Sequence, residues 1–291
     1  LADKFTFEVP GAKFSPAYKK KFWDGKIRLI NTQTGEVYCG LLDKITTFCD
    51  EHNYTYEFVD NTYYGLPFQV NEMISKEGVK DYMNAISSYK PRSYQVEGVY
   101  DALRHNRKLL ISPTASGKSL MIYAIVRYFV EKGKNILIVV PTTSLVEQMY
   151  KDFADYGWDV GSFCHKIYAG RERETDSQVI ITTWQSIYKL PRKYFERFSV
   201  VIGDEAHQFK SKSLVSIMTK LHQAKYRFGF TGTLDGSQTH KWVLEGLFGP
   251  SYKIIRTEEL MVKGHIAKLD INVLLLKHSP NKFETYEDEV Q

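Results

Sequence analysis

The chain has 291 residues, 43% of them hydrophobic and 25% charged, which suits one large or two ordinary globular domains. No apolar run approaches the roughly 20 residues that cross a bilayer, and the first residues lack signal-peptide character, so we expect a cytoplasmic protein without membrane contact. The three cysteines, Cys39, Cys49 and Cys164, are too scattered for a zinc site or a disulfide framework. The formal charge of +5 fits a nucleic-acid partner without requiring one.

The first 88 residues are predicted to form a small α+β domain, because they contain short aromatic-rich runs and no phosphate-binding loop. Between Lys13 and Arg28, six basic residues are opposed by one acidic residue, and aromatic residues lie among them. Such a segment can bind a nucleic-acid strand through phosphate contacts and stacking. It can equally be a solvated face whose aromatic residues pack inward. The DNA-binding candidates here are Lys19, Lys20, Lys21, Lys26 and Arg28.

A phosphate-binding loop is predicted at residues 112–119, which read Ser-Pro-Thr-Ala-Ser-Gly-Lys-Ser. The loop lies between an apolar run, 108–111, and a helical pattern that begins near Ser119, which is the context that such a loop requires. We assign Lys118 to the β- and γ-phosphates of ATP, the Ser119 hydroxyl to Mg²⁺, and Gly117 to close approach of the backbone. The remaining residues expected around the phosphates are Pro113, Thr114, Ala115 and Ser116.

One position of this loop departs from the general pattern. The pattern begins with glycine, and this chain has Ser112 there. We interpret the substitution as the mark of a subclass that tolerates a small residue at the first position.

From residue 108 onward, short apolar runs alternate with helical patterns, which is typical of βαβ units. Strands are predicted at 108–111, 136–140, 179–182, 200–202 and 227–230. A weaker run at 270–276 is expected to add an edge or returning strand, and the polar residues 279–291 are expected to form a linker. The fold class is therefore α/β, with a mostly parallel sheet in a P-loop domain over 89–278.

An acidic motif, Asp204-Glu205-Ala206-His207, directly follows the apolar run 200–202. Asp204 would emerge at the carboxyl end of a buried strand, beside the phosphate loop, where Mg²⁺ must bind. Glu205 could polarise the attacking water. His207 could couple the nucleotide site to a neighbouring loop, or cap a helix. With Lys118, these three residues are the predicted catalytic set.

The order of these motifs resembles that of the superfamily 2 helicases over about residues 91–276. The resemblance implies a RecA-like domain, and it assigns the adenine side of ATP to Arg92, Tyr94 and Gln95, with Gln95 reading the base edge. It also implies two DNA-contacting loops, whose hydroxyl, amide and backbone groups bind phosphate and sugar without reading sequence. These loops are Pro141, Thr142 and Thr143, and Thr183, Trp184 and Gln185. The motif that links ATP to DNA grip would be Thr231, Gly232 and Thr233.

Within superfamily 2, the strings at 22–29 and 263–266 are most similar to phage helicases. This likeness implies an enzyme that acts in the host cytoplasm on branched DNA, such as forks, junctions and R-loops, in which RNA is a further partner. Superfamily 2 enzymes carry a second RecA-like domain, whose arginine finger contributes about 10³ to 10⁵ in rate. We therefore expect an N-terminal half, lacking residues at both ends, that binds ATP and alone hydrolyses it poorly.

Two other functions fit part of the pattern. A DNA-packaging or restriction translocase also combines a phosphate loop with adjacent carboxylates, but packaging motors often place an arginine in that loop, and 112–119 contains none. A non-enzymatic nucleic-acid clamp would have no reason to keep Lys118, Ser119, Asp204 and Glu205 together. The helicase interpretation accounts for more of the motifs than either alternative.

Overall fold

The computed structural model describes residues 1–58, 70–168, 175–234, 238–267 and 273–275. Its largest element is a seven-stranded sheet in the order β5-β6-β4-β7-β8-β3-β9, in which every neighbouring pair is parallel. The strands are β3 (Arg107–Ile111), β4 (Ile136–Val140), β5 (Cys164–Ile167), β6 (Val179–Thr183), β7 (Val200–Gly203), β8 (Tyr226–Thr231) and β9 (Ser251–Lys253). The α/β fold predicted from alternating strands and helices is therefore confirmed.

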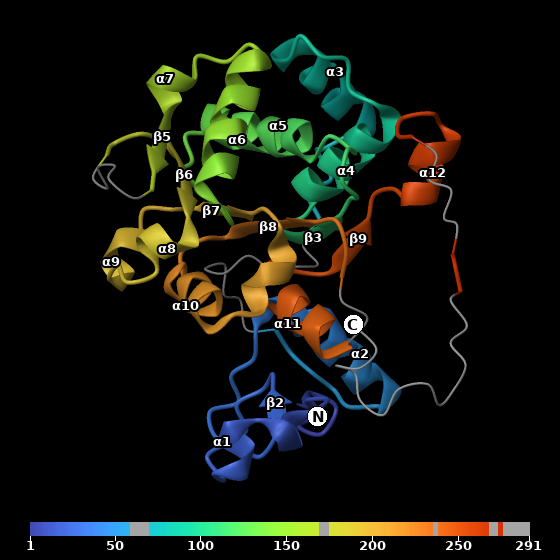
Figure 1. The fold of residues 1–291 in the computed structure, drawn as a ribbon, viewed down its shortest axis with the longest axis vertical. Helices are drawn as coiled ribbons and strands as arrows, with labels where there is room; N and C mark the ends of the chain where they lie inside the picture. Colours follow the sequence, from blue (N-terminus) through green and yellow to red (C-terminus); the bar gives the residue numbers. More distant parts are fainter. Residues whose placement is uncertain (59–69, 169–174, 235–237, 268–272, 276–291) are drawn as a thin grey trace, which may run out of the picture.

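Both faces of the sheet are covered by helices (Figure 1). The central strand β4 reads Ile-Leu-Ile-Val-Val, and all five of its side chains are buried. Alternate residues point to opposite faces of a strand, so Ile136, Ile138 and Val140 join one core while Leu137 and Val139 join another. A continuous apolar run is what a strand buried on both faces requires.

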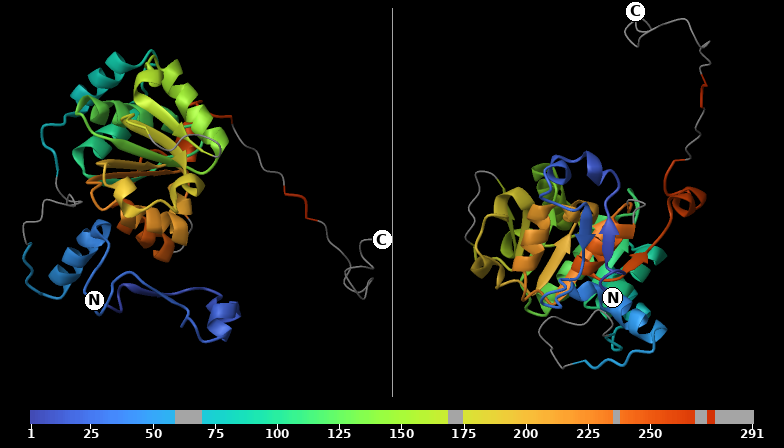
Figure 2. Two further views of the ribbon diagram at one scale, coloured as in Figure 1. Left: turned by 90° about the vertical axis from the view of Figure 1, so that its left-hand side faces the viewer. Right: turned by 90° about the horizontal axis from the view of Figure 1, so that it is seen from below.

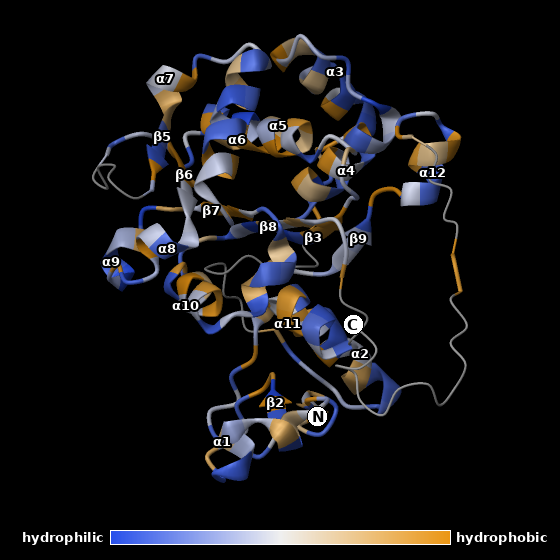
Figure 3. Cartoon of the chain, in the orientation of Figure 1, coloured by the Kyte–Doolittle hydropathy of each residue, from blue (hydrophilic) through white to orange (hydrophobic). Residues whose placement is uncertain are grey.

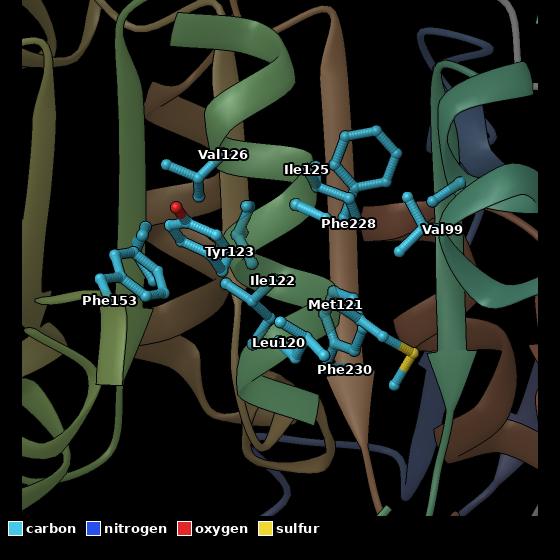
Figure 4. Packing of buried hydrophobic residues seen from close by; sticks show 14 of the residues in the cluster. Val99, Leu120, Met121, Ile122, Tyr123, Ile125, Val126, Phe153, Phe228 and Phe230 are labelled. Atoms are coloured by element: carbon cyan, nitrogen blue, oxygen red, sulfur yellow. The ribbon is translucent and has the colours of Figure 1, made fainter. Parts of the chain in front are cut away.

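The first core lies under α3 (Lys76–Ile86), α4 (Ser93–Arg104), α5 (Lys118–Glu131) and α6 (Thr143–Asp155). In Figure 4, residues of α5 lie over Phe228 and Phe230 of β8. Met121 and Tyr123 are fully buried, and nine residues of α5 are buried in all. A helix so apolar on most sides is buried within the protein, and α5 holds the phosphate loop that precedes it against the sheet.

The opposite face is covered by α8 (Trp184–Ile187), α9 (Arg192–Phe195), η3 (Ala206–Lys210), α10 (Lys212–Lys220) and α11 (Gln238–Phe248). The covering helices carry hydrophobic residues beside hydrophilic ones (Figure 3), as amphipathic helices do. Two further short helices are α7 (Val160–Phe163) and α12 (Thr257–Val262). Within the described residues, no helix is both long and apolar enough to span a membrane.

The N-terminal module, residues 1–58, contains a small antiparallel pair, β1 (Thr6–Glu8) and β2 (Lys26–Arg28). Its helices are η1 (Ala12–Phe14), α1 (Pro16–Lys19), η2 (Cys39–Leu41) and α2 (Leu42–Glu51). Phe5, Leu29 and Leu41 form a third core with Trp242 of α11. Figures 1 and 2 show α1 at the far end of this module, away from the large sheet.

The module is joined to α11 by close packing and by buried charge. At Gly40 an added Cβ would lie 2.0 Å from the carbonyl oxygen of Glu245, so only glycine fits there. The carboxylate of Glu245 is buried, accepts a 2.6 Å hydrogen bond from Ser251 Oγ, and lies 3.2 Å from Nζ of Lys44. A buried charge needs such partners. Lys44 of the N-terminal module therefore supplies the positive charge beside the buried carboxylate of Glu245 in α11.

Several predicted elements match the structure closely, and others do not. The predicted strands 136–140 and 200–202 correspond to β4 and β7, whereas β5, β9 and α11 were not predicted. The run at 270–276 lies largely outside the described residues, and its described part, 273–275, is exposed and contains no strand. The predicted linker also lies outside them. The division at residue 88 stays a prediction; α3, on its N-terminal side, packs on α4 and α5.

Candidate functional site

The predicted phosphate loop lies at the carboxyl end of β3 and leads directly into α5. Gly117 has φ of +77°, and Ala115 has φ of +64°, so the loop turns twice through the left-handed region before the helix begins. An added Cβ at Gly117 would lie 2.3 Å from Nε2 of Gln95. Glycine is therefore favoured here by the backbone angle, and an added Cβ would also displace the amide of Gln95.

Ser112 has a structural role that explains the departure from the general pattern. Its side chain is fully buried, and its Oγ donates a 2.6 Å hydrogen bond to Oγ of Ser116. Ser116 in turn donates to the carbonyl oxygen of Pro113 at 2.6 Å. The Ser112 hydroxyl thus stabilises the loop through a buried hydrogen bond, which a glycine at position 112 could not form.

The acidic motif faces the phosphate loop. Nζ of Lys118 donates to Oε1 of Glu205 at 2.7 Å, although 87 residues separate the two in sequence. Asp204 is 8% exposed at the end of β7, and this burial raises the pKa of its carboxyl above the ordinary value, while the Lys118 charge acts in the opposite direction. Glu205 adopts φ of +48°, in the left-handed region, and its backbone N–H donates to Oδ1 of Asp204 at 3.0 Å. The predicted catalytic residues therefore occupy one site.

A cavity of about 310 Å³ lies between the loop and the acidic motif. Thr114, Ala115, Gly117, Lys118 and Ser119 line it from the loop, and Asp204 and Glu205 from the strand end. Its far wall is α6, which contributes Leu145, Gln148, Met149 and Asp152. A hollow lined by a lysine, a hydroxyl and two carboxylates can hold a triphosphate with a divalent cation.

The polar residues of α6 were not predicted. Asp152 lines the cavity, and the hydroxyl of Tyr156, just after α6, lies 2.7 Å from Oγ of Ser119. Burial raises the pKa of Asp152, while a hydrogen bond with Ser119 opposes the shift. A signal was present, because Gln148, Asp152 and Tyr156 are spaced at i, i+4 and i+8 and therefore share one helix face.

The predicted adenine motif packs directly on the phosphate loop. Nε2 of Gln95 donates to the carbonyl oxygen of Ser116 at 2.9 Å, and Oε1 accepts from the backbone N–H of Arg92 at 2.8 Å. The hydroxyl of Tyr94 also donates to Ser116, and Arg92 donates to that hydroxyl. Gln95 and Tyr94 are buried. The structure thus brings all three residues to the loop, with the Gln95 amide bonded to the protein backbone.

The predicted coupling motif lies at the end of β8, next to both other motifs. Nδ1 of His207 lies 3.1 Å from Oγ1 of Thr231 and 3.3 Å from Oε2 of Glu205. The backbone of Thr231 accepts from the N–H of Ser112 at 2.8 Å. Gly232 lies beside the same loop, and Thr233 is exposed. His207 therefore contacts the last residue of β8, and its coupling role stays a prediction.

The two predicted DNA loops follow neighbouring strands, with Val140 paired in register with Thr183. Thr142 and Thr143 are exposed and Pro141 is half-buried, and Oγ1 of Thr142 caps α6 by accepting from Leu145 N–H. In the second loop, Gln185 is exposed, whereas Thr183 is buried and Trp184 packs against the second core. The structure therefore places a patch of exposed polar groups at the carboxyl ends of β4 and β6.

The basic window of the N-terminal module is divided in two by the structure. Lys19, Lys20 and Lys21 are exposed around the end of α1, and none of them lies within ion-pair distance of a carboxylate in the described part of the chain. Arg28 forms an ion pair with Asp24, and this contact lowers the pKa of the Asp24 carboxyl to about 2. Nζ of Lys26 lies 3.7 Å from Oε1 of Glu8.

The aromatic residues of this window do not all pack inward. Phe14 is 70% exposed and Phe22 83%, while Trp23 is half-buried and donates from Nε1 to the Lys26 carbonyl at 2.8 Å. The inward-packing alternative therefore describes Trp23 and not the two phenylalanines.

Three motifs meet at one edge of a parallel sheet: the phosphate loop, the acidic motif after β7, and the threonine turn formed by residues 231–233 after β8. This arrangement defines a RecA-like domain of the superfamily 2 type. Residues 88–236 match the family described as type III restriction enzyme, res subunit, and residues 1–60 match DNA helicase UvsW, N-terminal. The chain belongs to the family of the phage helicase UvsW.

The relatives support this assignment. The ATP-dependent DNA helicase uvsW of Enterobacteria phage T4 is 32% identical over all of this chain and 60% of its own length. A crystal structure of the bacteriophage T4 UvsW helicase, 31% identical, has a TM-score of 0.76 and covers 87% of this chain and 91% of that one. The DNA 3'-5' translocase XPB2 of Sulfurisphaera tokodaii is 29% identical over 67% of this chain and 42% of its own length. The chain thus spans about half of the curated relatives' length.

Proposed function

We propose that the chain is the nucleotide-binding half of an ATP-dependent DNA helicase that remodels branched DNA. The observation that carries the proposal is the shared cavity of Lys118, Ser119, Asp204 and Glu205, on a chain that matches the N-terminal family of a DNA helicase along residues 1–60. The match of 88–236 to a restriction subunit fits a translocase equally well. The N-terminal match and the likeness of this whole chain to part of a helicase favour the helicase.

ATP would bind with its phosphates in the turn of the loop. In the structure, the ammonium group of Lys118 pairs with Glu205. When ATP is bound, this group would pair with the β- and γ-phosphate oxygens instead, because these carry more negative charge than one carboxylate. Glu205 would then be free to orient the attacking water. The partial positive charge at the start of α5 and the N–H groups of the loop would hold the remaining oxygens.

The site also fits Mg²⁺. This ion keeps most of its waters and takes only one or two protein ligands beside substrate phosphates, and the Ser119 hydroxyl and the Asp204 carboxylate line the same cavity. Asp152 could receive a hydrogen bond from a water in that shell. When bound, Mg²⁺ would neutralise charge on the β- and γ-oxygens.

DNA would contact the edge formed by the ends of β4 and β6, and the N-terminal lysines would contact phosphates of an additional arm. Such contacts are independent of sequence. The expected substrates are forks, recombination junctions and R-loops, the last with RNA as one strand. Full rate would require an arginine finger from a second RecA-like domain, worth about 10³ to 10⁵.

The test uses the protein extended through its second domain. Lys118→Ala should abolish ATP turnover and fork unwinding, while Lys132→Ala, a change at an exposed lysine remote from the cavity, should leave both unchanged. ATP turnover that survives Lys118→Ala would overturn the ATPase assignment. Turnover without strand separation on forks would indicate a translocase, and DNA binding that is insensitive to ATP would indicate a clamp.

A further inference from the structure

The end of the N-terminal module carries two large apolar side chains that the fold does not use. Phe14 closes η1 and is 70% exposed, and Phe22 follows α1 and is 83% exposed. Both lie among cations, and Nζ of Lys13 is 5.3 Å from the centre of the Phe14 ring. Exposed rings beside lysines suit a ligand that offers flat aromatic faces and negative charge together.

The backbone holds Phe22 outward by a defined motif. The N–H of Phe22 donates to the carbonyl oxygen of Ala17, and the N–H of Lys21 donates to that of Tyr18, both at 2.9 Å. Lys21 has φ of +58°. These are the two hydrogen bonds of a Schellman motif, whose last residue often packs back on the helix. With 83% of its surface exposed, Phe22 does so very little.

The other two aromatic residues of the basic window, Tyr18 and Trp23, have structural partners, although Tyr18 is 42% exposed. A Cβ added at Gly25 would lie 3.2 Å from the ring of Tyr18, which shows that this ring packs on the glycine backbone. Trp23 is held by its bond to Lys26. Phe14 and Phe22 are therefore more exposed than these two neighbours.

We propose that Phe14 and Phe22 stack on the base faces exposed where a duplex ends at the branch point of a forked nucleic acid. The proposal deepens the function proposed above, on which it rests. A closed duplex hides its base faces, so rings have nothing to stack on there. A simple single strand offers bases but lacks the charge density of a duplex, which places a phosphate every 1.7 Å or so. The end of a duplex arm offers both features to a surface of two rings and at least four lysines.

The experiment measures binding without nucleotide, so that it is independent of ATP hydrolysis. Three labelled DNAs are compared: a fork with unpaired arms, a dumbbell duplex closed at both ends, and a single strand. Phe14→Ala/Phe22→Ala should weaken fork binding by about tenfold or more, since each base-aromatic stack contributes about 1–3 kcal/mol. Dumbbell binding, which depends on the lysines, should be unchanged. In a fork that carries 2-aminopurine at the last base pair, the original protein should quench the 2-aminopurine fluorescence, and the Phe14→Ala/Phe22→Ala variant should not.

Two further variants keep the proposal open to failure. Phe22→Trp preserves a ring and should bind the fork as tightly as the original protein. Tyr54→Ala removes a ring that is 60% exposed and lies outside the basic window, and it should leave fork binding unchanged. Equal loss on fork and dumbbell, or no loss at all, would overturn the proposal, as would a loss confined to single strands. Unchanged DNA binding with lower thermal stability of the full-length protein would show that the rings cover another part of the chain. These affinities are measured without nucleotide, whereas the ATPase assignment fails through ATP turnover, so failure of one is distinguishable from failure of the other.

Discussion

Nδ1 of His207 lies 3.1 Å from Oγ1 of Thr231, so a single hydrogen bond joins the acidic motif to the end of β8. The same imidazole lies 3.3 Å from Glu205, which is bonded to Lys118. A change at the phosphate site can therefore reach the threonine turn through three side chains in direct contact.

Loss of this bond should separate nucleotide binding from the response to DNA. For Thr231→Val in the full-length protein, we expect ATP affinity within about twofold of the original and DNA stimulation of turnover reduced by about fivefold or more, in the range of measured coupling energies. Thr231→Ser keeps the hydroxyl and should retain most of the stimulation. Equal behaviour of the Val and Ser variants in a coupled ATPase assay would contradict a role for the bond.

The buried hydroxyl of Ser112 should contribute to stability more than to nucleotide binding. Ser112→Gly removes the hydrogen bond to Ser116 and adds backbone freedom, so the free energy of unfolding should fall by about 1–2 kcal/mol. The general loop pattern has glycine at this position, so affinity for a fluorescent ATP analogue should change little. Urea denaturation checks the first expectation and a binding titration the second. An unchanged denaturation midpoint would show that this hydrogen bond is unimportant.

The close contact at Gly40 predicts a strong response to one methyl group. Gly40→Ala would place Cβ 2.0 Å from a backbone oxygen of α11, and overpacking of this kind costs about 1–3 kcal/mol or more. We expect a lower urea midpoint and faster tryptic cleavage within residues 1–58. Gly161→Ala is the matched control, because its new Cβ would have an ordinary 3.6 Å contact. Identical protease patterns for both variants would disprove tight docking.

Burial raises the pKa of the Cys164 thiol to about 12. Its folded pKa lies above the unfolded value of about 8.5, so its contribution to stability is complete below that pH and is lost as the pH rises toward 12. A variant with Cys164 as its only cysteine should react with a thiol reagent at pH 9 far more slowly when native than when unfolded. A variant with only Cys49, which is half-buried, should react at more similar rates in the two states. Fast native reaction of Cys164 would contradict its burial.

The three lysines around α1 should determine part of the salt dependence of DNA binding. Each phosphate contact on duplex DNA contributes a slope of about −0.9 to log K against log salt, so Lys19→Ala/Lys20→Ala/Lys21→Ala should reduce the slope by up to about 2.7. Replacing Lys80 and Lys132, which are exposed elsewhere, should leave it unchanged. If the triple variant had the same slope as the original protein, these lysines would be solvated residues that do not contact DNA phosphates.

The elements that the sequence predicted are those with a strong local signal. The run Ile136 to Val140 is apolar because both faces of β4 are covered, and a run of that kind is visible without a structure. Edge strands lack it: β5 has half-buried residues at two of four positions, and β9 has only three residues, none of them buried. Their pairing depends on neighbours distant in sequence, which periodicity does not report.

The candidate site divides in the same way. Motif spacing was sufficient to place Lys118, Asp204 and Glu205 at one edge of the sheet. The contribution of α6 depends on which face of that helix meets the loop, and the contact between Lys44 and Glu245 joins segments about 200 residues apart. Long-range contacts of this kind follow from packing, so they could not be inferred from composition or spacing.

The contact at Gly40 has a consequence for the DNA arrangement proposed above. An added Cβ at Gly40 would meet the backbone of α11, so the segment around Gly40 cannot slide along that helix. In the proposed function, the amino-terminal module would then hold Phe14 and Phe22 at one separation from the nucleotide cavity, as a gauge rather than a tether. Branches held at that separation would align with the motor, and arms of other geometry would miss it.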